Sequence, residues 1–210
     1  MTTAPVELIV LDVHGVVLNS PLRSFFHTMA VATGQDPYDV QRRWDRELRV
    51  PTWTGELSDE AVWNGLLGPG RRRGTPIWWR SQMEATYRPG PVVPLLDTWA
   101  RRAPIWLLSN HRGTWLRERL ERMDLIRHFT RILVSDALGA VKPAPEAFQP
   151  ILETGVDPAR VLYVDDQLHN VVAARRHGLQ GLQLQADEAS LAVVDRAVQG
   201  RPRRASTRAS

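Results

Sequence analysis

The 210-residue chain contains no cysteine, and Lys142 is the single lysine among its 27 basic residues. Without cysteine there can be no disulfide and no thiolate metal site. Any metal ion must therefore be held by oxygen or by histidine nitrogen, which favours a hard cation. Arginine serves wherever else a basic side chain is needed. A site that requires a compact ammonium group is one place where arginine cannot replace lysine.

Long apolar runs are also missing. None approaches the roughly 20 residues that cross a bilayer, and the N-terminus lacks a basic region followed by a hydrophobic segment, so we expect a cytoplasmic protein with no membrane partner. Residues 201–210 carry four arginines and no acid, and without them the basic residues fall to 23, the number of acidic ones. We expect this basic tail to be disordered, and we do not expect nucleic acid as a partner.

An apolar run near the N-terminus ends abruptly in a carboxylate. Residues 6 to 11 have the pattern of a buried strand in a parallel sheet, and Asp12, His14 and Gly15 follow almost directly. Asp12 should then stand at the carboxyl end of the strand. In open α/β sheets this is the edge where ligands bind.

Residues 19 to 89 have the pattern of four amphipathic helices. Three of them begin with a capping signal, which is Asp36 before a proline, Ser58, or Thr75 before a proline. The aromatic residues in this insert recur at helical spacing. We interpret them as packing residues rather than as a ligand cage.

From residue 91 onward the pattern alternates between helix and strand, which is typical of a parallel sheet with crossover helices. The expected strands are 105–108, 131–134, 161–164 and 181–184, and the expected helices are 94–102, 113–122, 145–154, 168–177 and 188–199. With the first strand they predict a Rossmann-like, doubly wound α/β core of residues 1–18 and 90–200. Residues 19–89 would form a four-helix cap. The disordered tail, residues 201–210, would follow the core.

Polar residues follow three of the expected strands. They are Asp12 and His14 after the first, Ser109, Asn110 and His111 after the second, and Asp165, Asp166, His169 and Asn170 after the fourth. A parallel sheet brings such strand ends together, although they are far apart in sequence. A loop near Lys142 can add a cation. We expect His111 and His169 to be partly exposed loop residues beside this group.

The combination resembles the haloacid dehalogenase superfamily, whose members are mostly magnesium-dependent phosphatases. The resemblance covers residues 6 to about 184. It rests on four motifs in order: Asp12 with Gly15, Ser109-Asn110, Lys142-Pro143, and Asp165-Asp166 with Asn170 and Gly178. The helical insert is similar to the cap of the first subclass of this superfamily.

The resemblance implies a covalent mechanism at Asp12. As nucleophile, Asp12 would form an aspartyl-phosphate that water then cleaves. Mg²⁺ would be held by Asp12, by the backbone carbonyl of His14 and by Asp166, while Asp165 would hold a metal-bound water or orient its neighbour.

The other motifs imply phosphate binding. Ser109, Asn110 and Lys142 would bind the phosphoryl group and stabilise its charge during transfer. The expected substrate is a small phosphorylated metabolite. A phosphomonoester such as a sugar phosphate fits this description.

His14 departs from the family pattern, because its counterpart is usually a second aspartate that protonates the leaving oxygen and later activates water. Histidine, with an ordinary pKa of about 6.5, can in principle do both, although Mg²⁺ and Lys142 would lower that pKa. We adopt a working phosphatase with His14 as acid and base. A slow enzyme with a persistent phosphoaspartate stays open, as does a pseudoenzyme that binds a phosphorylated ligand or a protein. Dehalogenation is disfavoured, because Asp165 and Asp166 would repel an anionic haloacid.

Overall fold

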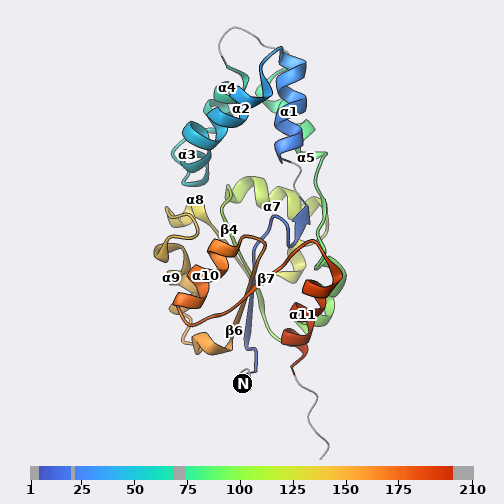
Figure 1. Cartoon of the computed structure of the whole chain (residues 1–210), viewed down its shortest axis with the longest axis vertical. Coiled ribbons are helices and arrows are strands. Elements are labelled where there is room, and N and C mark those ends of the chain that lie inside the picture. Colours follow the sequence, from blue (N-terminus) through green and yellow to red (C-terminus); the bar gives the residue numbers. More distant parts are fainter. Residues whose placement is uncertain (1–4, 20–21, 69–73, 201–210) are drawn as a thin grey trace, which may run out of the picture.

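The structure is a computed structural model that describes residues 5–19, 22–68 and 74–200. The predicted disordered tail, residues 201–210, lies outside the described residues. Figure 1 shows two parts, a sheet flanked by helices and a group of helices above one end of the sheet. No helix in the described part of the chain is long and apolar enough to cross a membrane.

The sheet has five parallel strands in the order β5-β4-β1-β6-β7, which confirms the Rossmann-like prediction. The strands are β1 (Leu8–Leu11), β4 (Ile105–Ser109), β5 (Arg131–Val134), β6 (Val161–Asp165) and β7 (Gln180–Gln183). The helices of this part are α6 (Leu96–Ala100), α7 (Gly113–Arg122), α8 (Ser135–Leu138), α9 (Gln149–Leu152), α10 (Leu168–Arg176) and α11 (Glu188–Gln199). Short 3₁₀ turns at Val93–Leu95, Ile126–His128, Pro145–Phe148 and Pro158–Arg160 complete the connections.

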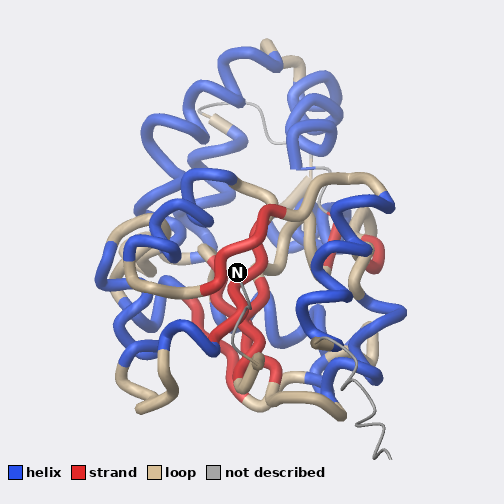
Figure 2. Tube along the Cα trace, turned by 60° about the horizontal axis from the view of Figure 1, so that its bottom comes forward, coloured by secondary structure: helices blue, strands red, loops and turns tan. Residues whose placement is uncertain are grey.

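Helices cover both faces of the sheet, as Figure 2 shows. Alternate side chains of β1 point to opposite faces, because side chains alternate along a strand. Ile9 and Leu11 belong to a large apolar cluster with residues of α6, α7 and α11, whereas Leu8 and Val10 belong to a second cluster with residues of α9 and α10. Both faces of β1 are therefore buried, which explains its continuous apolar sequence.

The second part, which we call the cap, consists of α1 (Leu22–Thr33), α2 (Pro37–Arg43), a π-helical segment η1 (Trp44–Leu48), α3 (Arg49–Trp53), α4 (Asp59–Leu67) and α5 (Pro76–Glu84). The three capping signals form as predicted. The side chains of Asp36, Ser58 and Thr75 accept hydrogen bonds from the first-turn backbone N–H groups of α2, α4 and α5. The segments α2, η1 and α3 follow one another without a break.

A two-stranded antiparallel ribbon, which no sequence pattern predicts, connects the two parts. Its strands are β2 (Leu18–Asn19) and β3 (Arg88–Pro89). Gly90 follows the second strand and lies against the chain near Val16, so that a Cβ atom at position 90 would lie 2.3 Å from the Val16 carbonyl oxygen. The backbone can approach this closely only because residue 90 is glycine.

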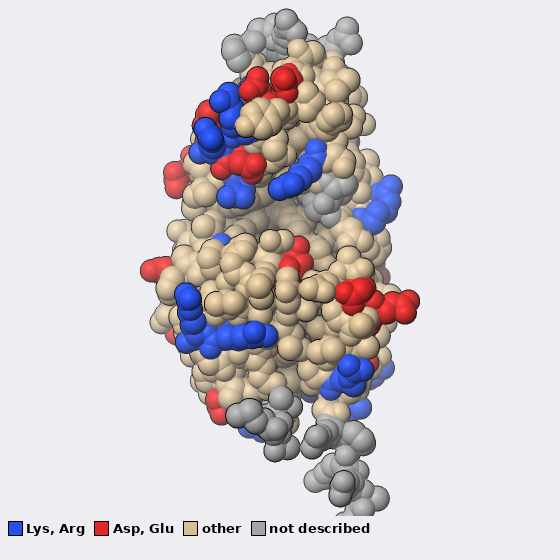
Figure 3. Space-filling view, in the orientation of Figure 1, with Lys and Arg blue, Asp and Glu red and all other residues tan. Residues whose placement is uncertain are grey.

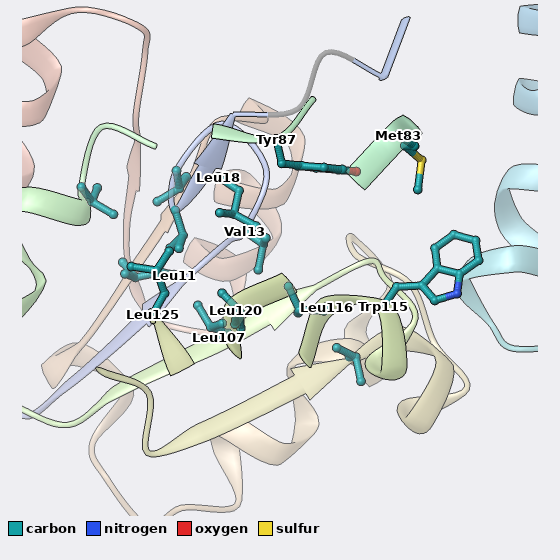
Figure 4. Close-up of a cluster of buried hydrophobic side chains, with 14 of the residues drawn as sticks. Leu11, Val13, Leu18, Met83, Tyr87, Leu107, Trp115, Leu116, Leu120 and Leu125 are labelled. Atoms are coloured by element: carbon teal, nitrogen blue, oxygen red, sulfur yellow. The ribbon is translucent and has the colours of Figure 1, made fainter. Parts of the chain in front are cut away.

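One apolar cluster extends across the junction between cap and core. Figure 4 shows Leu11 and Leu107 of the sheet near Leu116 and Leu120 of α7, with Met83 and Tyr87 arriving from the cap side. All of these side chains are buried. The cap is thus packed onto the core rather than merely tethered to it.

Candidate active site

Three strand ends meet at one edge of the sheet and carry polar side chains. Because β1 lies between β4 and β6, Asp12, Ser109 and Asp165 stand close to one another at the carboxyl edge. The loop after α8 brings Lys142 to the same place, where it is only 4% exposed. The structure therefore gathers residues that lie up to about 150 positions apart.

Lys142 connects two members of a group of three carboxylates. Its Nζ lies 2.6 Å from Asp12 Oδ1 and 2.8 Å from Asp165 Oδ2. Carboxylate oxygens of Asp12, Asp165 and Asp166 lie within 4.8 Å of one another. One ammonium group cannot balance three carboxylates at a buried site, so the group favours binding of a further cation. Oxygen donors alone suit a hard ion such as Mg²⁺.

The charges in this group depend on one another. Burial raises the pKa of Asp12 to about 7, with the Lys142 ammonium opposing the rise and the Asp165 carboxylate adding to it. Burial also works against the charge on Lys142, but the two carboxylates outweigh it and raise the Lys142 pKa. Although burial works to raise the pKa of Asp165, the Lys142 ammonium holds it below its usual range. Asp12 is thus the member whose charge would benefit most from a metal ion.

Asp165 is surrounded by hydrogen-bond donors of the protein. Its carboxylate accepts from the Tyr163 hydroxyl at 2.5 Å, from the Gln167 backbone N–H at 2.8 Å, and from Asn170 Nδ2 at 3.1 and 3.2 Å. Together with the ammonium group of Lys142, these donors use both carboxylate oxygens. Asp165 is therefore well placed to hold Lys142 in position.

Asp166 is less constrained and lines a cavity. Its side chain accepts a hydrogen bond from Gln167 Nε2 at 2.7 Å. Gly15, which has a φ of +80°, makes room for it, because a Cβ atom at position 15 would lie 2.7 Å from Asp166 Oδ2. Burial raises the pKa of Asp166. Its position at the cavity makes the Asp166 carboxylate a suitable ligand for a cation.

Ser109 and Asn110 occupy different positions at the end of β4. Ser109 is buried and lines the cavity. The Asn110 side chain instead clasps the backbone of Lys142: its Nδ2 donates to the Lys142 carbonyl at 3.0 Å, and its Oδ1 accepts from the Lys142 N–H at 2.7 Å. This clasp fixes the loop that delivers the ammonium group.

The His14 imidazole is packed between two other rings. Its centroid lies 5.7 Å from that of Tyr87 and 5.1 Å from that of His111. Nε2 of His14 is buried and has no hydrogen-bond partner among the described residues. Burial, together with the positive charges of Arg119 and Lys142, lowers the pKa of His14 to about 3. The imidazole is therefore neutral at pH 7, and the same surroundings that keep it neutral make it a weak base.

His111 is buried, which corrects the expectation of a partly exposed loop residue. It is only 1% exposed, its Nδ1 lies 2.8 Å from the Arg112 carbonyl oxygen, and its Nε2 lies 3.1 Å from Arg119 Nη1. Since arginine can only donate, Nε2 must accept and Nδ1 must carry the hydrogen. His111 is thus a neutral imidazole, and burial lowers its pKa well below the usual range. His169, by contrast, is exposed.

Three residues that support the site were missed by the sequence analysis. Tyr163 lies inside a strand and carries no motif. Arg119 and Glu84 have the appearance of surface charges on amphipathic helices, yet they form a buried ion pair beside His111. The small exposed fractions of the two side chains, 2% and 4%, depend on how the cap meets the core, which no local sequence pattern reports.

A cavity of about 820 Å³ opens above the carboxylates and continues into the cap. Figure 3 shows the surface hollowed between the two parts, with basic side chains on the cap side. All three histidines next to the sequence motifs, which are His14, His111 and His169, line this cavity. The predicted site residues Asp12, Ser109, Asn110, Lys142 and Asp166 line it as well.

Comparison with known sequences identifies relatives. The family model described as haloacid dehalogenase-like hydrolase matches residues 96–183. A curated protein from Pseudomonas aeruginosa, phosphoglycolate phosphatase 1, is 25% identical over 190 residues, which is 83% of this chain and 67% of that protein.

Solved structures share the fold. The haloacid dehalogenase family enzyme BT-2542 from Bacteroides thetaiotaomicron aligns with a TM-score of 0.77 and 15% identity, covering 90% of this chain and 99% of that one. The same enzyme in complex with magnesium and inorganic phosphate aligns with a TM-score of 0.73 and 16% identity, covering 89% and 98%. L-2-haloacid dehalogenase from Xanthobacter autotrophicus aligns with a TM-score of 0.63 and 19% identity, covering 89% and 81%.

The motifs occur in order along the chain and meet at one edge of a sheet that has the same fold as these enzymes. The family model matches the part of the chain that includes the second, third and fourth motifs. By its motifs, by its fold and by the family model that matches residues 96–183, the chain is therefore similar to the haloacid dehalogenase-like hydrolases.

Proposed function

We propose that the protein is a magnesium-dependent phosphatase that hydrolyses a small phosphomonoester through an aspartyl-phosphate at Asp12. The observation that carries this proposal is the group formed by buried Asp12 and Asp165 with half-buried Asp166, which Lys142 balances only in part. The similarity to a phosphoglycolate phosphatase supports it, as does the similarity to an enzyme that binds magnesium together with phosphate.

The metal ligands would be Asp12, Asp166 and the backbone carbonyl of His14. Asp165 would hold a metal-bound water or orient its neighbour. When bound, Mg²⁺ would neutralise charge on the carboxylate and on the phosphate, so that two anions can approach each other. The donors present are oxygens, which is the set that this ion prefers. We also propose the division into a core of residues 1–18 and 90–200 and a cap of residues 19–89.

In the first step, a carboxylate oxygen of Asp12 forms a bond to phosphorus, and the bond between phosphorus and the leaving oxygen breaks. The electron pair of that bond stays on the leaving oxygen. The Ser109 hydroxyl and the Lys142 ammonium stabilise the charge on the transferring group. In the second step, water attacks the phosphorus of the aspartyl-phosphate, which releases phosphate and regenerates Asp12. The neutral imidazole of His14 would take the proton from that water, but with a pKa of about 3 it is a weak base, so we expect this second step to be slow.

The alternative is a pseudoenzyme that binds a phosphorylated ligand or a protein without turnover. The position of His14 favours it, because a packed and neutral imidazole stands where family members usually carry a carboxylic acid. Dehalogenation is a weaker candidate despite the similarity to dehalogenase structures. Asp166 faces the cavity and would repel a haloacid carboxylate.

A phosphate-release assay tests the proposal. Purified protein with Mg²⁺ should hydrolyse at least one member of a panel of sugar, aryl and acyl phosphates, and EDTA should stop the reaction. Asp12→Asn should remove turnover, and trapping with acid should detect a phosphorylated protein only when Asp12 is present. Absence of turnover across the panel, or turnover that survives Asp12→Asn, would refute the proposed function.

A further inference from the structure

The cavity changes character with depth. Its floor is polar and holds Asp12, Ser109, Lys142 and Asp166. Its outer edge is also polar, because Arg23, Asp45 and Arg49 of the cap line it and are exposed to solvent. The other cap residues that line the cavity are mainly buried apolar side chains, and we place them between floor and edge because they are the least exposed.

Aromatic rings dominate this middle region. The described cap residues that line it include Phe26, Trp44, Trp53, Trp63, Met83 and Tyr87. Most of them are almost fully buried, whereas Trp53 lines the cavity and is only partly buried. Trp53 is held in place by stacking on His111, with 5.2 Å between ring centroids and 28° between ring planes.

Among the described cap residues that line the middle region, hydrogen-bonding groups are few, and one of them is the unpartnered N–H of the Trp63 ring. Gln41 donates to Asp45 at 2.9 Å, and Arg49 lies 3.8 Å from the same carboxylate, so these three side chains interact with one another near the edge. A sugar has several hydroxyl groups, and an apolar wall would strip them of water without replacing their hydrogen bonds. A flat ring meets no such cost there and gains contact with Trp53.

We propose that the leaving group is a flat aromatic ring, so that the substrate class is an aryl phosphomonoester, and that Trp53 is a specificity-determining residue that contacts this ring. The inference rests on the proposed function, since it places the phosphate at Asp12. The cavity, at about 820 Å³, leaves room for a one- or two-ring group above the carboxylates.

The packing of His14 agrees with this substrate class. When the bond from phosphorus to an aryl oxygen breaks, the electron pair is delocalised into the ring of the phenolate product. Such a leaving group departs with less help from a proton donor than an alkyl alcohol does. A buried imidazole between Tyr87 and His111 is therefore a smaller disadvantage for aryl phosphates than for sugar phosphates.

Three substrates separate ring recognition from leaving-group reactivity. 1-Naphthyl phosphate has an aromatic ring and a good leaving group, acetyl phosphate has a good leaving group without an aromatic ring, and glucose 6-phosphate has neither an aromatic ring nor a good leaving group. We expect kcat/KM to be highest for 1-naphthyl phosphate. Trp53→Leu should lower it by about tenfold for 1-naphthyl phosphate, which is the size expected for one aromatic contact, and by less than about twofold for acetyl phosphate.

Trp78→Leu is the matched control, because Trp78 lies on α5 of the cap, is 48% exposed and does not line the cavity. It should change none of the three values. Trp53→Phe keeps a ring and should retain most of the preference, which guards against a fold defect in the leucine variant. Equal or faster turnover of glucose 6-phosphate, or an unchanged preference in Trp53→Leu, would overturn the inference.

A binding measurement keeps the inference distinct from the proposed function. Calorimetry of the Mg²⁺-loaded wild type should show tighter binding of 1-naphthylmethylphosphonate than of methylphosphonate, and Trp53→Leu should remove the difference. If no phosphate ester is hydrolysed but this difference appears, the phosphatase proposal fails and the ring site stands. If both phosphonates bind equally, the ring site fails whatever the turnover.

Discussion

Glu84 of the cap and Arg119 of helix α7 form a buried, bidentate ion pair across the junction between cap and core. Nη2 of Arg119 lies 2.5 Å from Oε1 of Glu84, and Nε lies 2.8 Å from Oε2. The Arg119 guanidinium also lies 3.4 Å from the centre of the Tyr87 ring. The pair thus joins the end of the cap to the helix that supports His111.

Neutralising this pair should destabilise the protein strongly. Glu84→Gln leaves the Arg119 charge buried without its counterion, so we expect the free energy of unfolding to fall by ~3–5 kcal/mol. Urea titration of the metal-free protein measures the loss. Glu118→Gln is the control, since Glu118 pairs with Arg80 across the same junction but is 55% exposed. It should cost at most ~1 kcal/mol. Similar losses in both variants would contradict the buried role of Glu84.

The buried histidines should make stability depend on pH. The folded pKa of His111 is lowered, so below the unfolded value of about 6.5 the unfolded chain binds a proton that the folded chain does not. Stability from this residue is complete above that pH and is lost as pH falls. Asp12, whose folded pKa is raised, acts in the opposite direction, so the prediction concerns a difference between two proteins.

The variant His111→Gln lacks the imidazole that binds this proton in the unfolded wild type. Between pH 6 and 5 in EDTA, the unfolding free energy of the wild type should depend on pH more steeply than that of the variant, by ~1.4 kcal/mol per pH unit. Urea titrations at three pH values supply the slopes. Parallel slopes would mean that His111 is protonated in the folded protein.

Lys142 should not be replaceable by arginine. Its ammonium lies between Asp12 and Asp165 in a space that is almost closed, and a planar guanidinium is larger and donates in fixed directions. We expect Lys142→Arg to lower kcat by ~10²-fold or more, close to the effect of Lys142→Met, as for loss of one group that stabilises the transferring charge. Near-normal turnover in the arginine variant would show that any cation suffices at this position.

Magnesium should stabilise the folded protein in the absence of substrate. At 100 times its dissociation constant, Mg²⁺ should add ~2.7 kcal/mol to the free energy of unfolding, which a thermal melt detects as a rise in Tm over the protein in EDTA. Asp166→Asn should remove most of this rise. Asp39→Asn changes an exposed cap carboxylate and should leave it intact. A rise that persists in Asp166→Asn would place the ion elsewhere.

His14→Asp should broaden the range of leaving groups. A carboxylic acid at this position can protonate a departing alkyl oxygen, a contribution of ~10²–10⁴-fold where protonation limits the rate. We therefore expect turnover of glucose 6-phosphate to rise relative to that of 1-naphthyl phosphate. A fall in both rates by the same factor would show that the imidazole is the adapted group.

Much of the fold could be predicted because its signals are local. The apolar run of β1 and the caps at Asp36, Ser58 and Thr75 each depend on a few neighbouring residues, and the structure has them as predicted. The two-residue strands β2 and β3 are too short to show a periodic pattern. Their pairing depends on residues 70 positions apart.

The candidate site likewise contains residues that local sequence patterns reveal and residues that only tertiary packing brings into place. The residues that carry motifs stand at strand ends, where topology alone brings Asp12, Ser109 and Asp165 together. Tyr163 and Arg119 act through contacts that arise only when distant elements pack. Their burial follows from tertiary structure, as does that of His111, and the amino-acid pattern around each is that of an ordinary strand, helix or loop.

The ribbon of β2 and β3 makes the cap an exchangeable module. Both passages of the chain between the two parts run side by side through this ribbon, and Leu18 and Asn19 pair directly with Pro89 and Arg88. The segment between Asn19 and Arg88 could be exchanged without lengthening or breaking a strand of the main sheet, provided that its replacement supplies a counterion for Arg119 and covers the apolar residues against which Met83 and Tyr87 pack. Such an exchange offers a route to chimeric enzymes, in which a cap from another protein determines the substrate while the core and its site residues stay unchanged.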